Sequence, residues 1–393
     1  MARFAGGKAP FLRSVDQGGQ DTKKIMRDFL IGLIPVILFA WYKNGIQVYI
    51  NGDCTIWEML YPLAFILLGG IISMLMEGLV FVITDKETRS LKAIMQKINL
   101  SFAVVPGLLI ALILPMYTPI WVLVFGCFMG TVVGKMLFGG FGHNIFNPAL
   151  VGYLAIGFTF SGLIGNSGGY LNPSEVLVDS YAGATPLGTL AMFKTISWDT
   201  LVAPYGTLWN FFLGTIPGSL GETSALAILV SFIWLSARKV IKWSTPVIYV
   251  GTVFILSWII GIASGDSGLW FPSYSILSGG LMFGAVFMAT EPVTTPKNPL
   301  GKIIYALLLG VLTVLFRMIG NYPEGVATSL IVMNIFTIPV DQVTAEIRAN
   351  GITKKTWVKA AVMLLIILGI GFYAVTKSVN TYTIFVGFFG GVM

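Results

Sequence analysis

The stretch DSYAGATPLG, residues 179–188, places a threonine hydroxyl in a polar gap between two long apolar segments. The hydroxyl of Thr185 can serve as an ester oxygen, and the small residues before it leave room for a bulky attached group. The same residues also suit an ordinary turn, because glycine permits positive φ and proline fixes its own φ. Both interpretations stay open on residue chemistry alone.

Two links rich in glycine and asparagine could hold a polar ligand. They are FGGFGHNIFNPALVGY (138–153) and GNYPEGVA (320–327). Broken backbone at membrane depth persists only where it is buried in protein or lines a cavity. The side chains of Asn144 and Asn147 could therefore cradle a ligand, although tight turns at the membrane surface would explain the same residues.

Four charged residues lie in or beside apolar segments. A charge at the bilayer centre costs at least about 2.5–3.5 kcal/mol, so Glu77 and Arg317 are candidates for handling an ion or a cofactor. Both are close enough to a predicted segment end to snorkel instead. Lys135 and Glu291 are expected near the cytoplasmic interface, where charges are ordinary.

The composition is that of an integral membrane protein. Of 393 residues, 56% are apolar and 10% are charged, whereas soluble domains carry roughly 25% charged residues. The chain has two cysteines and one histidine. No metal site is expected, because a self-contained iron–sulfur or structural zinc site needs about four such ligands.

Eleven apolar runs are long enough to be predicted as spans, since a span needs roughly 17–25 residues. The first 27 residues are polar and basic, and no cleavable signal peptide is expected. The predicted spans are 27–43, 59–84, 98–115, 119–139, 145–164, 221–240, 243–264, 269–290, 301–320, 324–340 and 357–376.

Basic residues predict the orientation. Lys and Arg cluster in four segments on one side, which the positive-inside rule assigns to the cytoplasm: 1–27, 84–97, 238–242 and 341–359. The segment 165–220, which contains Thr185, is then the largest extracytoplasmic loop. The net charge of +7 reflects this bias, so no nucleic-acid partner is expected.

Two short motifs indicate an internal duplication. PMYTP (115–119) and PVTTP (292–296) share Pro, Thr and Pro in register, and each joins two predicted spans. Because five spans separate them, they lie on opposite sides, as in an inverted repeat. The predicted fold is all-α and polytopic, with about ten spans as two five-helix repeats plus an extra C-terminal helix.

This prediction divides the chain into five parts. A cytoplasmic N-terminal segment precedes the first repeat, the extracytoplasmic loop separates the two repeats, and a cytoplasmic linker leads to the extra helix. The boundaries are 1–27, 28–164, 165–220, 221–340 and 341–393.

At residues 179–187 the pattern D-x-x-A-G-A-T-P-L resembles the Ser/Thr-Gly-Ala-Thr flavinylation motif of one membrane-protein family. These are membrane subunits of the Rnf and Na⁺-translocating NADH:quinone reductase complexes. Four further stretches are similar to signatures of the same family. They are APFLRS with TKKIMRDFLIGLIPV, FGGFGHNIFNPALVGY, MATEPVTTP, and GNYPEGVATSLIVMNIFTIPVDQ. The resemblance covers about residues 9–345 and favours the Rnf D subunit. It implies a ten-helix inverted repeat resembling urea transporters.

The resemblance implies an FMN bound through its phosphate to Thr185 by a phosphoester bond. Asp179, Gly183, Ala184 and Pro186 then belong to the attachment site, and Ala182 departs from the hydroxyl residue that usually opens the motif. Some family members also hold riboflavin within the helix bundle. Asn144, Asn147 and Arg317 are candidates for such a second flavin or for coupling.

The resemblance also implies partners and a place in the cell. Rnf complexes couple electron flow between reduced ferredoxin and NAD⁺ to movement of Na⁺ or H⁺. The expected partners are the FMN-bearing G subunit, the membrane A and E subunits, the NAD-binding C subunit and the ferredoxin-facing B subunit. The chain is expected in the bilayer of a bacterial or archaeal cell membrane, as a subunit that is not catalytic alone.

Two other functions compete with this one. The inverted repeat also suits a flavin-free channel or transporter for a small polar solute, although fold alone does not decide function. Ala182 is compatible with a scaffold subunit that has lost its flavin.

Overall fold

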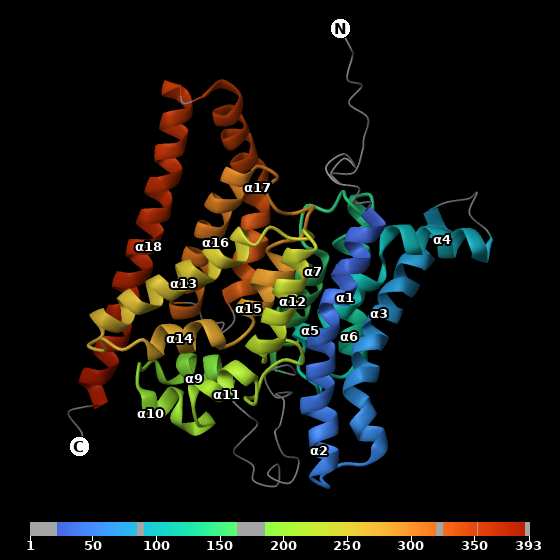
Figure 1. Cartoon of the computed structure of the whole chain (residues 1–393), viewed down its shortest axis with the longest axis horizontal. Helices are drawn as coiled ribbons and strands as arrows, with labels where there is room; N and C mark the ends of the chain where they lie inside the picture. The colour runs from blue at the N-terminus through green and yellow to red at the C-terminus, as the bar shows by residue number, and fades with distance from the viewer. Residues whose placement is uncertain (1–21, 85–89, 163–184, 320–324, 352, 390–393) are drawn as a thin grey trace.

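The computed structural model describes residues 22–84, 90–162, 185–319, 325–351 and 353–389. Every regular element in these residues is a helix (Figure 1). Within them, seven helices are long and apolar enough to cross a membrane, or nine if each of two bent helix pairs is one span. The predicted all-α polytopic membrane fold is therefore confirmed.

The first half of the chain runs from α1 to α7. Its first and fourth spans each contain a π-helix, and its third span is bent. The elements are α1 (Thr22–Trp41), η1 (Tyr42–Ile46), α2 (Gln47–Ile50), α3 (Ile56–Thr84), α4 (Leu91–Ser101), α5 (Val104–Ile113), α6 (Ile120–Cys127), η2 (Phe128–Val133), η3 (Met136–Phe138) and α7 (Pro148–Thr159).

The region predicted as the loop 165–220 contains short helices in its described part. They are α9 (Pro186–Phe193), α10 (Trp198–Leu201), η5 (Ala203–Tyr205) and α11 (Leu208–Leu213). Figure 1 places them at one end of the bundle, together with α2 and opposite the start of α1. We call these two ends the α9 end and the α1 end.

The second half and the extra helix follow. Their elements are α12 (Ala225–Ala237), α13 (Ser244–Ala263), α14 (Trp270–Leu277), α15 (Leu281–Phe283), η6 (Gly284–Met288), α16 (Pro299–Ile319), α17 (Gly325–Asn350) and α18 (Lys354–Phe389). The extra C-terminal helix α18 packs on α16 and α13 and extends into the apolar tail.

Each predicted span coincides with an observed helix or bent helix pair. Two of these helices, α7 and α12, are shorter than a span needs by itself. Two predicted spans belong to bent helix pairs: α4 with α5 at 55°, and α14 with Leu281–Met288 at 64°. The prediction of a loop at 84–97 is wrong for α4, which already begins at Leu91. The bend thus recurs at the equivalent place in both halves.

The two Pro-Thr-Pro links lie at opposite ends of the bundle. The link 115–119 follows Leu114, whose carbonyl accepts from the N–H of Leu220 in the segment after α11, at the α9 end. The link 292–296 lines the same cavity as Thr22, at the α1 end. This arrangement agrees with the predicted inverted repeat.

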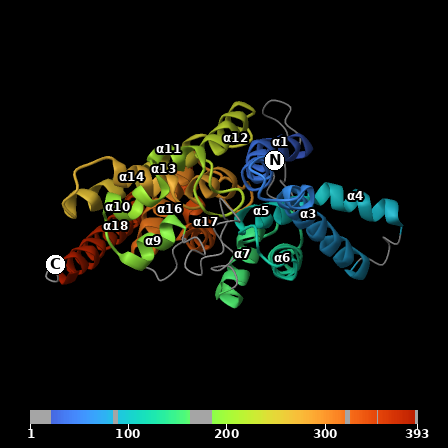
Figure 2. The ribbon, with the colours of Figure 1, turned by 90° about the horizontal axis from the view of Figure 1, so that it is seen from below.

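The halves lie side by side and meet through equivalent helices (Figure 2). The first spans, α1 and α12, pack where Gly32 faces Leu235, and Arg238 Nε donates to Asp28 Oδ2 at 3.0 Å. The fifth spans, α7 and α17, meet where the N–H of Asn147 donates to Asn334 Oδ1 at 3.0 Å.

A buried cation from the next span caps the break in each bent span. Lys135 Nζ donates to the carbonyl of Ser101, the last residue of α4, at 2.7 Å. Arg317 donates to the carbonyls of Ser275 and Ser278 at the end of α14, at 2.7 and 3.2 Å. The last carbonyls of a helix lack intrahelical partners and carry partial negative charge, so these cations stabilise both breaks.

Glycines let α3 and α5 approach closely. A Cβ added at Gly107 would overlap the carbonyl oxygen of Gly69 on the facing helix. Such contacts of small residues are a general means of packing membrane helices.

We expect Gly107→Val to lower the free energy of unfolding by about 1–3 kcal/mol, because overpacking forces the two backbones apart. Thermal unfolding in detergent measures the effect. Gly157→Val on α7 is the matched control, since a Cβ there meets no atom within 4 Å. Equal melting temperatures for the two variants would contradict the close α3–α5 contact.

Candidate functional site

Thr185 is the residue at which α9 begins. Its side-chain oxygen accepts a hydrogen bond from the N–H of Gly188 at 3.2 Å, and Pro186 occupies the first helical position. This is the usual chemistry of a helix start, because a threonine cap satisfies an N–H and proline needs none. Thr185 is half-buried, so the isolated turn considered from the sequence is instead a helix cap.

The start of α9 is fixed by aromatic residues of neighbouring elements. The hydroxyl of Tyr274 on α14 donates to the carbonyl of Pro186. The hydroxyls of Thr189 and Tyr205 are 2.8 Å apart. Phe211 packs against both tyrosine rings, with centroid distances of 5.8 and 5.6 Å. The hydroxyl of Thr185 is therefore held on a well-anchored helix.

This geometry fits a phosphoester on Thr185. The N–H groups of the first turn of α9 point toward its N-terminus, where the helix dipole favours a negative group. Phosphates bind readily at such positions. Asp179, Ala182, Gly183 and Ala184, which the sequence assigns to the same site, lie outside the described residues.

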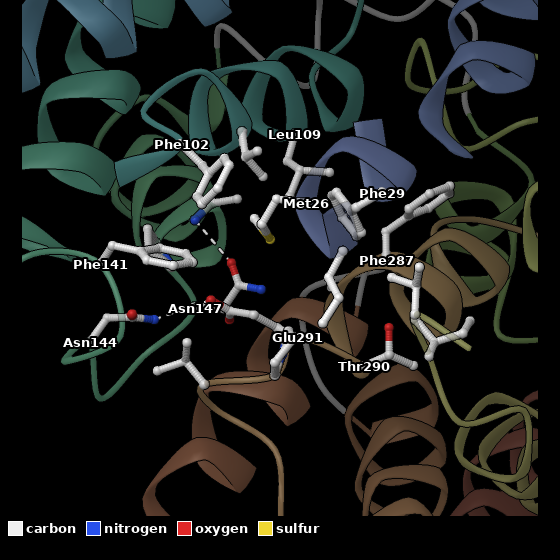
Figure 3. A pocket seen from close by; sticks show the side chains of 18 of the residues that line it. Met26, Phe29, Phe102, Leu109, Phe141, Asn144, Asn147, Phe287, Thr290 and Glu291 are labelled. Carbon is white, nitrogen blue, oxygen red and sulfur yellow. Dashed lines mark hydrogen bonds between the residues drawn. The ribbon is translucent and has the colours of Figure 1, made fainter. Parts of the chain in front are cut away.

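A second candidate site is a cavity of about 480 Å³ at the α1 end, between the two halves. Its walls combine aromatic rings with amide, hydroxyl and charged groups (Figure 3). The aromatic residues are Phe29, Phe102, Phe141 and Phe287. Cavities of this size with apolar walls and a few polar groups are typical of sites for small molecules.

Asn144 and Asn147 both line this cavity. Asn147 Oδ1 accepts from the N–H groups of Ala149 and Leu150 and so caps α7. Asn144 Nδ2 donates to Glu291 Oε1 at 3.1 Å. Arg317 is not among the lining residues, so the structure separates it from the two asparagines.

Thr245 supplies a polar group without a protein partner. Its side chain lines the cavity and is 2% exposed, and its hydroxyl has no hydrogen-bond partner among the described residues. A buried hydroxyl without a partner costs roughly 1–3 kcal/mol. A ligand with a hydrogen-bonding group would remove that cost, which fits a polar ring system such as a flavin.

Glu291 is the cavity residue that the sequence interpretation missed. It was expected near the cytoplasmic interface as an ordinary charge. Its carboxyl lies among Asn144, Thr294 and Lys135, and the residue lines the cavity. Burial raises the pKa of this carboxyl to about 7. The sequence did contain a signal for this position. Glu291 directly precedes the PVTTP link, and this link must turn the chain back into the bundle.

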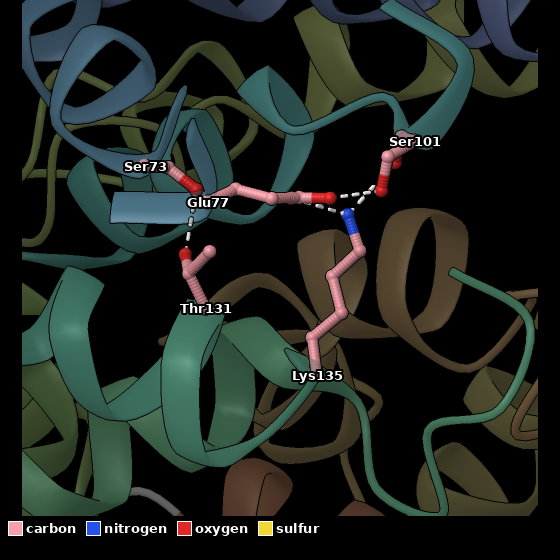
Figure 4. Close-up of polar contacts among 5 residues, drawn as sticks. All are labelled: Ser73, Glu77, Ser101, Thr131 and Lys135. Carbon is pink, nitrogen blue, oxygen red and sulfur yellow. Dashed lines mark hydrogen bonds and ion pairs between the residues drawn. The ribbon is translucent and has the colours of Figure 1, made fainter. Parts of the chain in front are cut away.

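Glu77 and Lys135 form an ion pair inside the first half (Figure 4). Lys135 Nζ lies 2.8 Å from Glu77 Oε2, and the hydroxyl of Ser101 donates to Glu77 Oε1. Both charged side chains are almost fully buried. The snorkelling considered for Glu77 is wrong, because its carboxylate is buried and pairs with Lys135 within the bundle. Lys135, expected near the cytoplasmic interface, is buried in protein.

We expect Lys135→Met to destabilise the chain by about 3–5 kcal/mol, because it leaves a buried carboxylate without its cation. Adding Glu77→Gln should restore part of the loss, since no unpaired charge then remains. Denaturant titration in detergent measures both variants. A single variant as stable as the double variant would show that Glu77 is not a charged partner of Lys135.

Comparison with known proteins identifies the family to which the chain belongs. The profile of the NQR2, RnfD, RnfE family matches residues 8–350. The D subunit of the proton-translocating ferredoxin:NAD(+) oxidoreductase complex of Clostridium ljungdahlii is 33% identical over 335 residues, 84% of this chain and 92% of that protein.

Two further relatives are similar. The D subunit of the Na(+)-translocating ferredoxin:NAD(+) oxidoreductase complex of Acetobacterium woodii is 31% identical, over 85% of this chain and 92% of that protein. The B subunit of the Na(+)-translocating NADH-quinone reductase of Chromohalobacter salexigens is 36% identical, over 60% of this chain and 56% of its own length. With the family profile matching nearly the whole chain, the protein belongs to the NQR2, RnfD, RnfE family.

Proposed function

We propose that the chain is the FMN-carrying membrane subunit of an Rnf-type complex that passes electrons between ferredoxin- and NAD-linked partners and couples this flow to translocation of Na⁺ or H⁺. The observation that carries the proposal is the position of Thr185 at the start of α9. Family membership and the names of the relatives support the kind of complex.

FMN supplies one- and two-electron redox chemistry when it is bound. The chain contributes the attachment oxygen of Thr185, the N–H groups of the first turn of α9 and the contacts that fix this helix. Tyr274 and Tyr205 both form hydrogen bonds with α9, so the position at which the flavin is attached is fixed. Fixed positions matter because the complex passes electrons between separate carriers.

The proposed orientation puts the α1 end in the cytoplasm and α9 outside. Described basic residues concentrate at the α1 end, for example Lys23, Lys97 and Lys242, which line cavities there. Positive charge retained in the cytoplasm is the general pattern for short loops. The attachment residue Thr185 then faces the extracytoplasmic side of a bacterial or archaeal cell membrane.

This orientation accommodates the proposed partners. The FMN-bearing G subunit would approach Thr185 from outside, and the A and E subunits would lie in the membrane beside this chain. The NAD-binding C subunit and the ferredoxin-facing B subunit would lie on the cytoplasmic side. The iron–sulfur clusters belong to these partners, since the two cysteines of this chain supply too few ligands.

A second flavin, riboflavin, is proposed for the cavity at the α1 end. The aromatic walls suit a planar ring, and the amide of Asn144 and the hydroxyl of Thr245 suit its polar edge. Arg317 and Glu77 act differently from a flavin ligand: each stabilises a broken span through buried contacts. Any role of theirs in coupling then works through the stability of these breaks.

The competing function is a channel or transporter for a small polar solute, which the inverted repeat and the cavity would also allow. A channel has no use for an attachment residue at the α9 end. Covalent flavin on Thr185 therefore discriminates between the two functions.

We expect Thr185→Ala to abolish covalent flavin, because alanine offers no ester oxygen. The full chain is co-expressed with the flavin-loading enzyme of this family, and fluorescence is recorded from denaturing gels. Thr207→Ala is the matched control, an exposed threonine that begins the nearby helix α11. Its fluorescence should equal that of the wild type.

Fluorescence that survives Thr185→Ala would place the flavin elsewhere. A wild-type chain without fluorescence, beside a loading enzyme active on another substrate, would favour the transporter or scaffold functions. The lost cap also costs about 0.5–2 kcal/mol of helix stability, so the melting temperature is recorded alongside.

A further inference from the structure

Glu291 is the only carboxylate among the described residues that line the cavity at the α1 end. It belongs to the link between η6 and α16, outside the membrane-spanning helices. Links between helices also supply other polar groups of the cavity, among them Asn144, Lys242 and Lys297. Its position makes Glu291 the one cavity residue able to give up a proton as a carboxylic acid.

The two halves of the chain each contribute a hydrogen-bond donor to this carboxyl. Asn144 Nδ2 of the first half donates to Oε1 at 3.1 Å, and Thr294 Oγ1 of the second half donates to Oε2 at 2.8 Å. Each oxygen thus has one neutral donor, and Glu291 lines the cavity. Neither donor carries a charge, so neither has to gain or lose one when the acid ionises.

Several charged or titratable groups face this site. Lys135 lies near Glu291 but is already paired with Glu77, and the ring of Tyr305 on α16 is also near. Lys242, Lys297 and Lys302 line the cavity as well. No residue that lines the cavity in the described chain therefore repels the carboxylate by like charge.

Burial and these contacts oppose each other. Burial favours the neutral acid and is the largest effect, while Thr294, Asn144 and Lys135 favour the carboxylate. The resulting pKa of about 7 leaves both forms populated at neutral pH. General acids and bases work best under this condition.

We propose that Glu291 is the proton-exchanging group of this cavity, taking protons from solvent at the α1 end and delivering them to a redox ring system bound beside it. This inference rests on the proposed second flavin.

The step joins an electron transfer to a proton transfer. Electrons reach the ring from the reduced carriers of the complex, the O–H bond of Glu291 breaks, and an N–H bond forms on the ring. The carboxylate that remains keeps its hydrogen bonds from Asn144 and Thr294. Water from the mouth of the cavity then returns a proton to Glu291. Oxidation of the ring reverses all three steps: Glu291 releases its proton to water, and its carboxylate then accepts the proton of the ring as the electrons leave.

The test uses the purified full chain with Thr185→Ala, so that only dissociable flavin remains. Its reduction by a rapidly mixed chemical reductant is followed by absorbance across a pH series. With Glu291 present, we expect the slope of the logarithm of the reduction rate against pH to change once near pH 7, because only the protonated acid delivers a proton to the ring. Glu291→Gln should remove this change of slope. The matched control Glu346→Gln, a carboxylate paired with Lys359 away from the cavity, should keep it.

Asn144→Ala provides a second variant. It removes a donor that favours the carboxylate, so the change of slope should move upward by roughly one pH unit. A residue with a purely structural role would not produce this shift. If Glu291→Gln binds no flavin, the result with Asn144→Ala decides whether Glu291 exchanges protons with the ring.

The outcomes separate the two claims. A change of slope that persists near pH 7 in Glu291→Gln, or that does not move in Asn144→Ala, overturns the inference while the second flavin stands. A chain that releases no dissociable flavin on acid extraction overturns the second flavin and this inference together. The covalent site at Thr185 is tested independently by gel fluorescence.

Discussion

Two broken spans, each capped by a buried cation, are the constraint on which the rest of this structure depends. Inside a bilayer no water replaces lost backbone hydrogen bonds, so a broken helix needs partners from the protein. Lys135 supplies them at the end of α4, and Arg317 supplies them at the end of α14. Without these contacts the carbonyls at both breaks would lose their charged hydrogen-bond donors.

The breaks have consequences for the cavity at the α1 end. Phe102, at the first break, has a positive φ and contributes an aromatic wall, and Phe287 follows the second break. The cavity lies where the two halves meet, so each half supplies part of its polar lining. The hydrogen bond between Asn144 and Glu291 joins the halves at this point. The repeat symmetry and the candidate site are thus parts of one arrangement.

The two candidate sites lie at opposite ends and use different chemistry. Thr185 offers an oxygen at a helix start, which suits a covalently attached anion. The cavity offers rings, amides and one protonatable acid, which suit a planar ligand held without a covalent bond. A protein that carries electrons across a membrane needs redox cofactors at different depths. The separation of the two candidate sites fits this proposed role.

The sequence by itself determined three features, because their signals are local in the chain. The lengths of the apolar runs predicted the spans, and the repeated Pro-Thr-Pro links predicted the inverted repeat. The stretch AGATPLG identified Thr185 as the candidate attachment residue. The side chains of Asn144 and Asn147 were also identifiable, since they sit in a break of the apolar pattern. Only the tertiary structure decided the roles of Glu77, Lys135, Arg317 and Glu291. Whether a charge snorkels, pairs or faces a cavity depends on neighbours from distant segments, and Glu77 and Lys135 meet only because α3 packs against the span that ends in η2.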